Sequence, residues 1–296
     1  SAAAVAAGVV ALALGTDTAG SIRLPAACCG VVGFKPSFDA VPRDGVQPLG
    51  ASLDHVGPIA ANVADAALAF AVMAGLPPAV PRRGPLGGLR IGVPTNYFFD
   101  PLGADVARAL TGALDRMRTD GAELVPVGLP GVEAAAALQF ATLCSEATDV
   151  HWETLNTRPE SLGADVHVRL EIGQFLPAIW YTRAQRRRAE LVAMFTTAMH
   201  GLDALVTPTV RVEPPRRGTT RVQLGGRELP LHTALTSLTM PFNLTGMPAL
   251  TLPCGRGDSG LPIGLQIVGQ CGDDWSVLRV AARVEDLLQY DPRRRP

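Results

Sequence analysis

Residues 15–27, with the sequence GTDTAGSIRLPAA, place one serine at the end of a turn built from small residues. Thr18, Ala19 and Gly20 carry short side chains or none, so the backbone can approach a ligand closely and successive amides can form an anion-binding nest. A serine hydroxyl is a weak nucleophile at neutral pH, and it needs a base and hydrogen-bond donors for the oxyanion that forms when it attacks a carbonyl. The stretch therefore predicts a nucleophile loop that presents Ser21.

Charged residues of opposite sign flank this turn. Asp17 and Arg23 lie on either side of Ser21 at a spacing that allows an ion pair to brace the loop, and Pro25 fixes the direction in which the chain leaves it. Because short glycine motifs are common in unrelated proteins, an ordinary glycine turn between two elements is the competing interpretation.

A longer span favours the nucleophile loop. Residues 1–37, SAAAVAAGVVALALGTDTAGSIRLPAACCGVVGFKPS, resemble the core of the amidase signature family of serine hydrolases. Later stretches resemble the same family in the same order, namely SLDHVGPIA at 52–60, DALVTPT at 203–209, TMPFNLTGMPALTLP at 239–253 and GLPIGLQIVG at 260–269. Agreement from one end of the chain to the other argues against coincidence.

The resemblance implies a Ser–cis-Ser–Lys triad that hydrolyses an amide C–N bond through an acyl-enzyme. Carried over residue by residue, Ser21 is the acylated serine, and the backbone amides of Thr18, Ala19, Gly20 and Ser21 form the oxyanion hole. The family usually has glycine where this chain has Ala19, and a β-carbon there would restrict the backbone if φ were positive.

Supporting residues are also implied by the resemblance. Gln266 and Asn243 match polar positions of the family that brace the core near the site, and they add to Asp17 and Arg23, for which the spacing of the charges already predicts a bracing role.

The rest of the triad is expected to lie outside the 296 residues. In the family, the cis-serine precedes the position of Ser1 in a GGSSGG-type run, and the catalytic lysine lies further upstream. Lys35 is the single lysine here, and it matches a GxKP segment that the family retains besides its catalytic lysine, so we expect a structural role for it. Arginine cannot replace a lysine base, because its guanidinium stays protonated. We expect one amidase domain over residues 1–296, truncated at its N-terminus and inactive by itself.

Composition places the chain among globular enzymes and excludes several other classes. It is 47% hydrophobic and 18% charged, and 296 residues can bury a large core. A net charge of −1 argues against a direct nucleic-acid partner. The apolar run over residues 2–14 lacks the basic flank of a signal peptide, and no apolar stretch reaches the length of a membrane span.

Cysteine and histidine usage indicates a cytoplasmic protein with no metal site, and no cofactor is expected because the implied chemistry is proton and acyl transfer by side chains and backbone dipoles. The five cysteines form an odd set with no CxxC spacing, which is typical of a reducing compartment. His55, His167, His200 and His232 share no ligand spacing, so no zinc site is expected. The expected partner is a small-molecule amide, and the sequence leaves a homodimer open.

Alternating helical and strand patterns predict an α/β fold. The resemblance to the amidase signature family implies a mostly parallel or mixed central sheet flanked by helices on both faces. An alanine-rich helix is expected at the start of the chain, and the loop over residues 212–228 is expected to be exposed. Strands are predicted at residues 9–14 (buried), 31–34, 89–93, 123–127, 202–206, 249–253 and 265–268, and helices at 62–74, 105–120, 134–153, 177–200 and 275–289.

The resemblance to the amidase signature family implies that residues 130–210 form a variable helical region that lines the substrate cleft. Glu146 and His151 are near enough in rotation to form a polar pair on one helix, for which we expect a structural role. Tyr181, Thr182 and Arg183 are candidates for shaping the cleft.

Three alternatives remain beside a general amidase. The first is the amidase subunit of a glutamyl-tRNA or aspartyl-tRNA amidotransferase, which uses the same triad to release ammonia from glutamine. The second is a non-catalytic amidase-like scaffold. The third rests on residues 257–260, GDSG, which match the nucleophile run of chymotrypsin-like proteases and would make Ser259 catalytic. That fold needs two β-barrels and an upstream histidine in a matching context, whereas the upstream sequence here is helical and alanine-rich.

Overall fold

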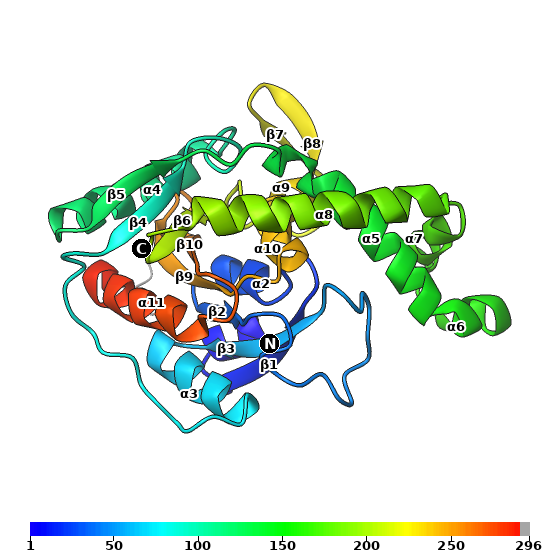
Figure 1. Cartoon of the computed structure of the whole chain (residues 1–296), viewed down its shortest axis with the longest axis horizontal. Helices are drawn as coiled ribbons and strands as arrows, with labels where there is room; N and C mark the ends of the chain where they lie inside the picture. Colours follow the sequence, from blue (N-terminus) through cyan, green and yellow to red (C-terminus); the bar gives the residue numbers. More distant parts are fainter. Residues whose placement is uncertain (291–296) are drawn as a thin grey trace.

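A mixed eight-stranded sheet forms the centre of the computed structural model, which describes residues 1–290 (Figure 1). The strand order is β1-β3-β2-β9-β10-β6-β4-β5. The strands are β1 (Leu12–Asp17), β2 (Val32–Lys35), β3 (His55–Ala60), β4 (Arg90–Pro94), β5 (Glu123–Val127), β6 (Ala204–Pro208), β9 (Ala249–Arg256) and β10 (Pro262–Val268). An α/β fold with a mixed sheet is thus confirmed.

Antiparallel pairing dominates the sheet. Only the β6-β4-β5 edge is parallel, and α4 (Ala104–Thr119) supplies the crossover between β4 and β5. The other neighbours, from β1 to β6, all pair antiparallel, and β9 and β10 are joined by the short turn over residues 257–261. A connection that short can only join antiparallel strands. Of the two sheet types predicted, the mixed sheet is therefore correct and the mostly parallel sheet is wrong.

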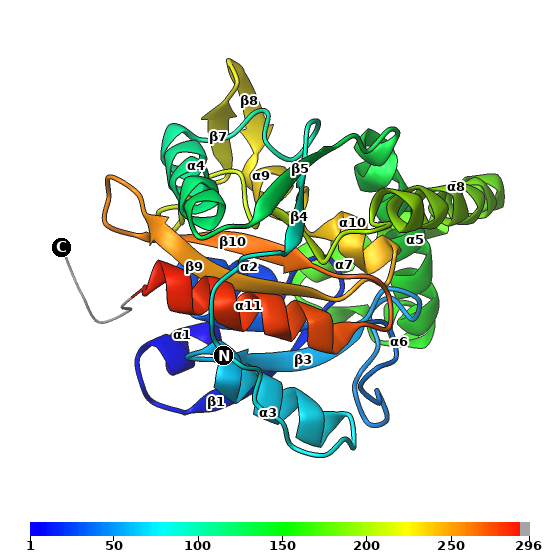
Figure 2. The same cartoon turned by 60° about the vertical axis from the view of Figure 1, so that its left-hand side comes forward.

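Helices cover both faces of the sheet, as predicted. Figure 2 shows α3 (Val63–Met73) and α11 (Asp274–Leu288) in front of the strands, with α2 (Arg23–Cys29) behind them. The remaining helices on or near the sheet are α1 (Ala2–Ala6), α9 (Leu231–Thr236) and α10 (Met240–Leu244). Side-chain caps explain where two of the predicted helices begin. Asn62 caps α3 by accepting a hydrogen bond from the Asp65 amide, and Asp273 caps α11 by accepting one from the Ser276 amide.

The first strand differs from its prediction. The alanine-rich start is helical as expected, but β1 begins at Leu12 instead of residue 9, and it lies at the edge of the sheet with β3 as its neighbour. Leu12 and Leu14 are therefore 43% and 60% exposed instead of buried.

The predicted helix over residues 134–153 is also wrong in its extent. The chain forms a 3-10 turn, η1 (Val132–Ala134), then α5 (Ala135–Val150) and α6 (Trp152–Thr157), with a break at His151. The turn η2 (Pro159–Ser161) and α7 (Ala164–Gln174), which the sequence did not predict, lead to the long α8 (Ala178–Ala198). Figure 1 shows α5 to α8 extending to one side of the sheet.

The loop predicted over residues 212–228 contains regular structure. Residues in and just after it form the hairpin β7 (Arg221–Leu224) and β8 (Arg227–Pro230), joined by Gly225 and Gly226, both at positive φ. A Gly-Gly pair between two short runs is a two-residue hairpin connection.

None of the helices in residues 1–290 combines the length and the apolar character that a membrane crossing requires.

Candidate active site

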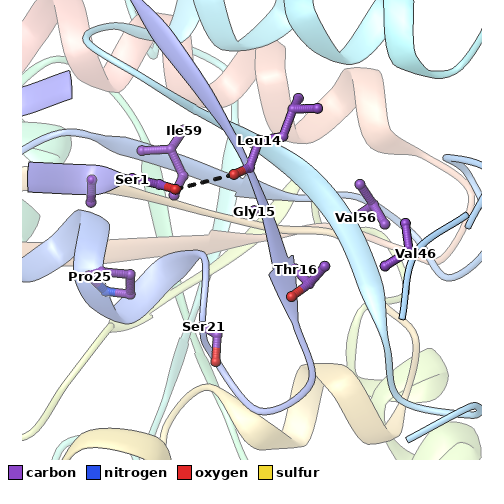
Figure 3. A pocket seen from close by; sticks show the side chains of 10 residues that line it. Ser1, Leu14, Gly15, Thr16, Ser21, Pro25, Val46, Val56 and Ile59 are labelled. Atoms are coloured by element: carbon purple, nitrogen blue, oxygen red, sulfur yellow. Dashed lines mark hydrogen bonds between the residues drawn. The ribbon is translucent and has the colours of Figure 1, made fainter. Parts of the chain in front are cut away.

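Ser21 lies in the connection between β1 and α2, at an exposed position. Together with Thr16, Pro25, Val46 and Val56 it lines an open cleft of about 520 Å³ (Figure 3). Within residues 1–290 no hydrogen-bond partner engages the Ser21 hydroxyl. The side chain predicted to be the nucleophile is therefore accessible to a ligand in a cleft.

A buried ion pair lies beneath this loop, which confirms the predicted pairing of Asp17 with Arg23. Nη2 of Arg23 is 2.9 Å from Oδ1 of Asp17, Nε is 3.0 Å from Oδ2, and both side chains are fully buried. The Asp17 carboxylate also accepts hydrogen bonds from the backbone amides of Gly20 at 2.7 Å and Ile22 at 3.2 Å. One carboxylate thus fixes the backbone on both sides of Ser21.

Arg23 joins this loop to two distant segments. Its Nη1 donates to the Thr239 carbonyl at 2.9 Å and to Oε1 of Gln266 at 2.7 Å, and its Nη2 donates to Oδ1 of Asn243 at 2.6 Å. Asn243 in turn donates to the carboxylate of Asp17 at 2.8 Å. The structure therefore brings together the four supporting residues that the sequence singled out.

The pKa of Asp17 reflects two opposing causes. Burial raises the pKa of the carboxyl, whereas the charge of Arg23 and the hydrogen bonds from Arg23 and Asn243 lower it. The net result holds the pKa of Asp17 below its ordinary value, so the carboxyl is ionised at neutral pH and pairs with the guanidinium.

The carbonyls of three consecutive loop residues each accept a hydrogen bond. The donors are Nε2 of Gln139 to the Thr18 carbonyl at 2.9 Å, Oγ1 of Thr239 to the Ala19 carbonyl at 2.6 Å, and the Leu24 amide to the Gly20 carbonyl at 2.7 Å. In a planar trans peptide the C=O and the following N–H point in opposite directions. Tying these carbonyls therefore sets the directions of the amides of residues 19–21.

The predicted oxyanion hole needs one correction. The Gly20 amide already donates to Asp17, so it braces the loop and is not free for an oxyanion. Among the described residues, the amides of Thr18, Ala19 and Ser21 meet no acceptor. Ala19 is not among the residues with positive φ, so its β-carbon causes no backbone strain.

Lys35 lies at the end of β2 and is fully buried. Its Nζ donates to the carbonyls of Pro36 at 3.0 Å and Met247 at 2.7 Å, and no hydrogen bond in residues 1–290 joins it to Ser21. Burial, assisted by the nearby charge of Arg23, lowers the pKa of Lys35 well below its usual value. These contacts join β2 to the segment before β9, in keeping with the expected structural role.

Polar residues of the helical region form a network other than the one expected. Glu146 on α5 accepts from the Ser52 hydroxyl at 2.6 Å and from the Tyr181 hydroxyl at 3.2 Å. His151 follows the end of α5 and forms no hydrogen bond with Glu146, so the predicted pair within one helix is wrong. Glu146 instead ties α5 to α8 and to the segment before β3.

The GDSG serine has a different setting from Ser21. Ser259 lies in the β9–β10 turn, and its hydroxyl donates to Glu213 at 2.8 Å. No histidine within residues 1–290 contacts it by a hydrogen bond, and the fold has no pair of β-barrels, so the protease alternative is wrong. Across the same described part of the chain, His, Cys, Asp and Glu form no group of three that could hold a metal ion.

Sequence reasoning missed three residues that hold the loop, namely Gln139, Thr239 and Asp54. Thr18 donates from its hydroxyl to Asp54 at 2.6 Å, and Asp54 also accepts the amides of Leu49 and Gly50. Asp54 and Thr239 both lie in stretches that resemble the family, which is a signal that could have found them. Gln139 has no such signal, because it lies in the variable helical region.

Comparisons with known proteins found matches along nearly the whole chain. The family model described as Amidase matches residues 1–278. An amidase from Pseudomonas putida is 38% identical over 98% of this chain, and a glutamyl-tRNA(Gln) amidotransferase subunit from Chloroflexus aggregans is 36% identical over 99% of it. A crystal structure described as that of an amidase superposes over 97% of this chain and 65% of its own, with a TM-score of 0.91 and 36% identity.

The chain spans about two thirds of the length of these relatives, covering 65% of the amidase and 66% of the amidotransferase protein. The family model covers most of the chain, and the sequence and structural matches run along nearly all of it. The chain therefore belongs to the amidase signature family.

Proposed function

We propose that the full-length protein hydrolyses a carboxylic amide through an acyl-enzyme on Ser21. The single observation that carries this proposal is the accessible Ser21 hydroxyl in a cleft, on a loop that the buried Asp17–Arg23 pair holds from below. A nucleophile held in one place removes part of the entropic cost of reaction.

The proposed chemistry has two steps. Ser21 Oγ attacks the amide carbonyl carbon, the oxyanion binds the free amides of the loop, and the C–N bond breaks to release ammonia or an amine. Water then attacks the ester, which releases the carboxylate and restores the hydroxyl. The Ser21 proton passes to a base and is returned to the leaving nitrogen.

We infer that this base is the cis-serine and lysine pair implied by the family resemblance, located in a segment of the full-length protein that precedes Ser1. Lys35 is a poor candidate because its amine is used by two carbonyls. The 296-residue chain alone should therefore show little or no turnover.

Relatives provide a second candidate function. Several proteins of similar identity are glutamyl-tRNA(Gln) amidotransferase subunits, so the substrate amide could be that of glutamine, with a partner protein holding the tRNA. Ammonia release by the full-length protein from glutamine, acetamide, benzamide and indoleacetamide distinguishes the two candidates. Turnover of glutamine alone favours the amidotransferase, and turnover of the other amides favours a general amidase.

Covalent labelling tests the nucleophile directly. A fluorophosphonate should label the full-length protein once, and Ser21→Ala should abolish labelling and lower amide turnover by at least about 1,000-fold. Ser259→Ala is the matched control, because this exposed serine lies in the β9–β10 turn, and it should label like the unmodified protein. Undiminished labelling of the Ser21→Ala protein would disprove the proposal.

A further inference from the structure

Gln139 is a polar side chain in an apolar part of α5. It is 3% exposed, and its helix neighbours Leu138 and Ala141 belong to a hydrophobic cluster with residues of α8 and α10. Its Nε2 donates to the carbonyl of Thr18, 121 residues earlier in the chain. This hydrogen bond connects α5 directly to the nucleophile loop.

The other half of the Gln139 amide is unsatisfied. Its Oε1 is buried and has no hydrogen-bond partner in residues 1–290. An orphaned buried acceptor destabilises a fold, and an apolar side chain of the same size would avoid that cost. Residues that break a local packing rule without a gain in stability concentrate at functional sites.

The hydrogen bond from Gln139 holds the peptide group between Thr18 and Ala19. Thr18 is anchored separately through its hydroxyl, which donates to Asp54, so the loop stays attached to the core without Gln139. The Thr18 carbonyl is held by Gln139, and peptide planarity then aims the following N–H, that of Ala19, in the opposite direction. The Ala19 amide is one of the loop amides with no acceptor in the described chain.

We infer that Gln139 is a positioning residue, which orients the Ala19 amide as an oxyanion donor. This inference rests on the proposed function of Ser21.

Fluorophosphonate kinetics on the full-length protein test this role without knowledge of the substrate. The phosphoryl oxygen uses the same donors as a carboxylic oxyanion, so the maximal inactivation rate reports on the loop and the half-saturating concentration reports on binding. Gln139→Met should lower the maximal rate about 10-fold to 100-fold, because misplacing a donor weakens transition-state stabilisation. The half-saturating concentration should stay within threefold.

A second variant keeps the shape and changes only the donor. A carboxylate in the Gln139→Glu protein cannot donate to the Thr18 carbonyl, but a protonated carboxyl can. Its labelling rate, divided by that of the unmodified protein at the same pH, should therefore rise as pH falls. A purely structural role would give a ratio that does not rise.

Gln185→Met is the matched control, because Gln185 is a half-buried glutamine that also bonds α5 but does not touch the loop. It should label like the unmodified protein. If Gln139→Met labels within threefold of the unmodified protein while Ser21→Ala does not label, the role of Gln139 is overturned and the proposed function stands. If Ser21→Ala still labels, the proposed function fails and the role of Gln139 fails with it.

Discussion

Asp17 and Arg23 form a fully buried ion pair directly beneath the loop that carries Ser21, with Oδ1 and Nη2 2.9 Å apart. The carboxylate holds two loop amides, and the guanidinium reaches Gln266 and Asn243 on segments more than 200 residues away in the chain. The hydrogen bonds that both charged groups make offset the cost of removing them from water, and together they fix one geometry of the loop.

Removing the guanidinium should destabilise the protein strongly. Arg23→Met leaves the Asp17 carboxylate buried without its counter-ion and deprives Gln266 and Asn243 of a donor. We expect a loss of roughly 3 to 5 kcal/mol in the free energy of unfolding, measured by urea denaturation at pH 7. Arg187→Met is the control, since Arg187 pairs with Glu190 at the surface and should cost less than about 1 kcal/mol. Equal losses in the two variants would contradict a structural role for the buried pair.

The same carboxyl should make stability sensitive to acid. The pKa of Asp17 is lower in the folded protein than its ordinary value of 3.8, so its stabilising contribution is complete above that value and is lost as pH falls below it. Urea denaturation of the unmodified and Asp17→Asn proteins between pH 3 and pH 7 isolates this effect. The difference in unfolding free energy should be constant near neutral pH and should shrink below about pH 4. A difference that widens toward low pH would show that folding raises the pKa of Asp17 instead of lowering it.

Local sequence features were sufficient to predict much of the site. The small residues before Ser21, with charges on both sides, predicted the loop and its ion pair, and the family resemblance predicted that Gln266 lies close by. The contact of Gln139 could not be predicted, because it depends on a long-range approach that no local pattern encodes, whereas Thr239 lies in a stretch that resembles the family.

The errors in the fold have similar physical causes. The apolar run over residues 9–14 is compatible with a central or an edge strand, and only the sheet order shows that β1 is at the edge. The break at His151 interrupts a helical pattern that contains no proline or glycine to announce it. By contrast, the hairpin of β7 and β8 could have been predicted, because a Gly-Gly pair such as Gly225-Gly226 is typical of a two-residue hairpin turn.

Gly20 should tolerate no side chain. Its φ is +134°, a conformation that L residues rarely adopt, and an added β-carbon would collide with Oγ1 of Thr239 and lie 2.9 Å from Leu24. Because that Thr239 oxygen holds the Ala19 carbonyl, Gly20→Ala should disturb the loop as well as strain it. We expect a loss of roughly 2 to 5 kcal/mol in unfolding free energy and at least a 10-fold slower fluorophosphonate labelling of the full-length protein.

Gly45→Ala separates backbone strain from steric conflict at the loop. Gly45 also has positive φ, +77°, but it is exposed and a β-carbon there would meet no atom within 4 Å. This variant should lose about 1 kcal/mol in unfolding free energy, because only its backbone conformation is unfavourable. Its rate of fluorophosphonate labelling should not change. If the two variants label at the same rate, then the close approach of Thr239 to Gly20 does not shape the loop around Ser21.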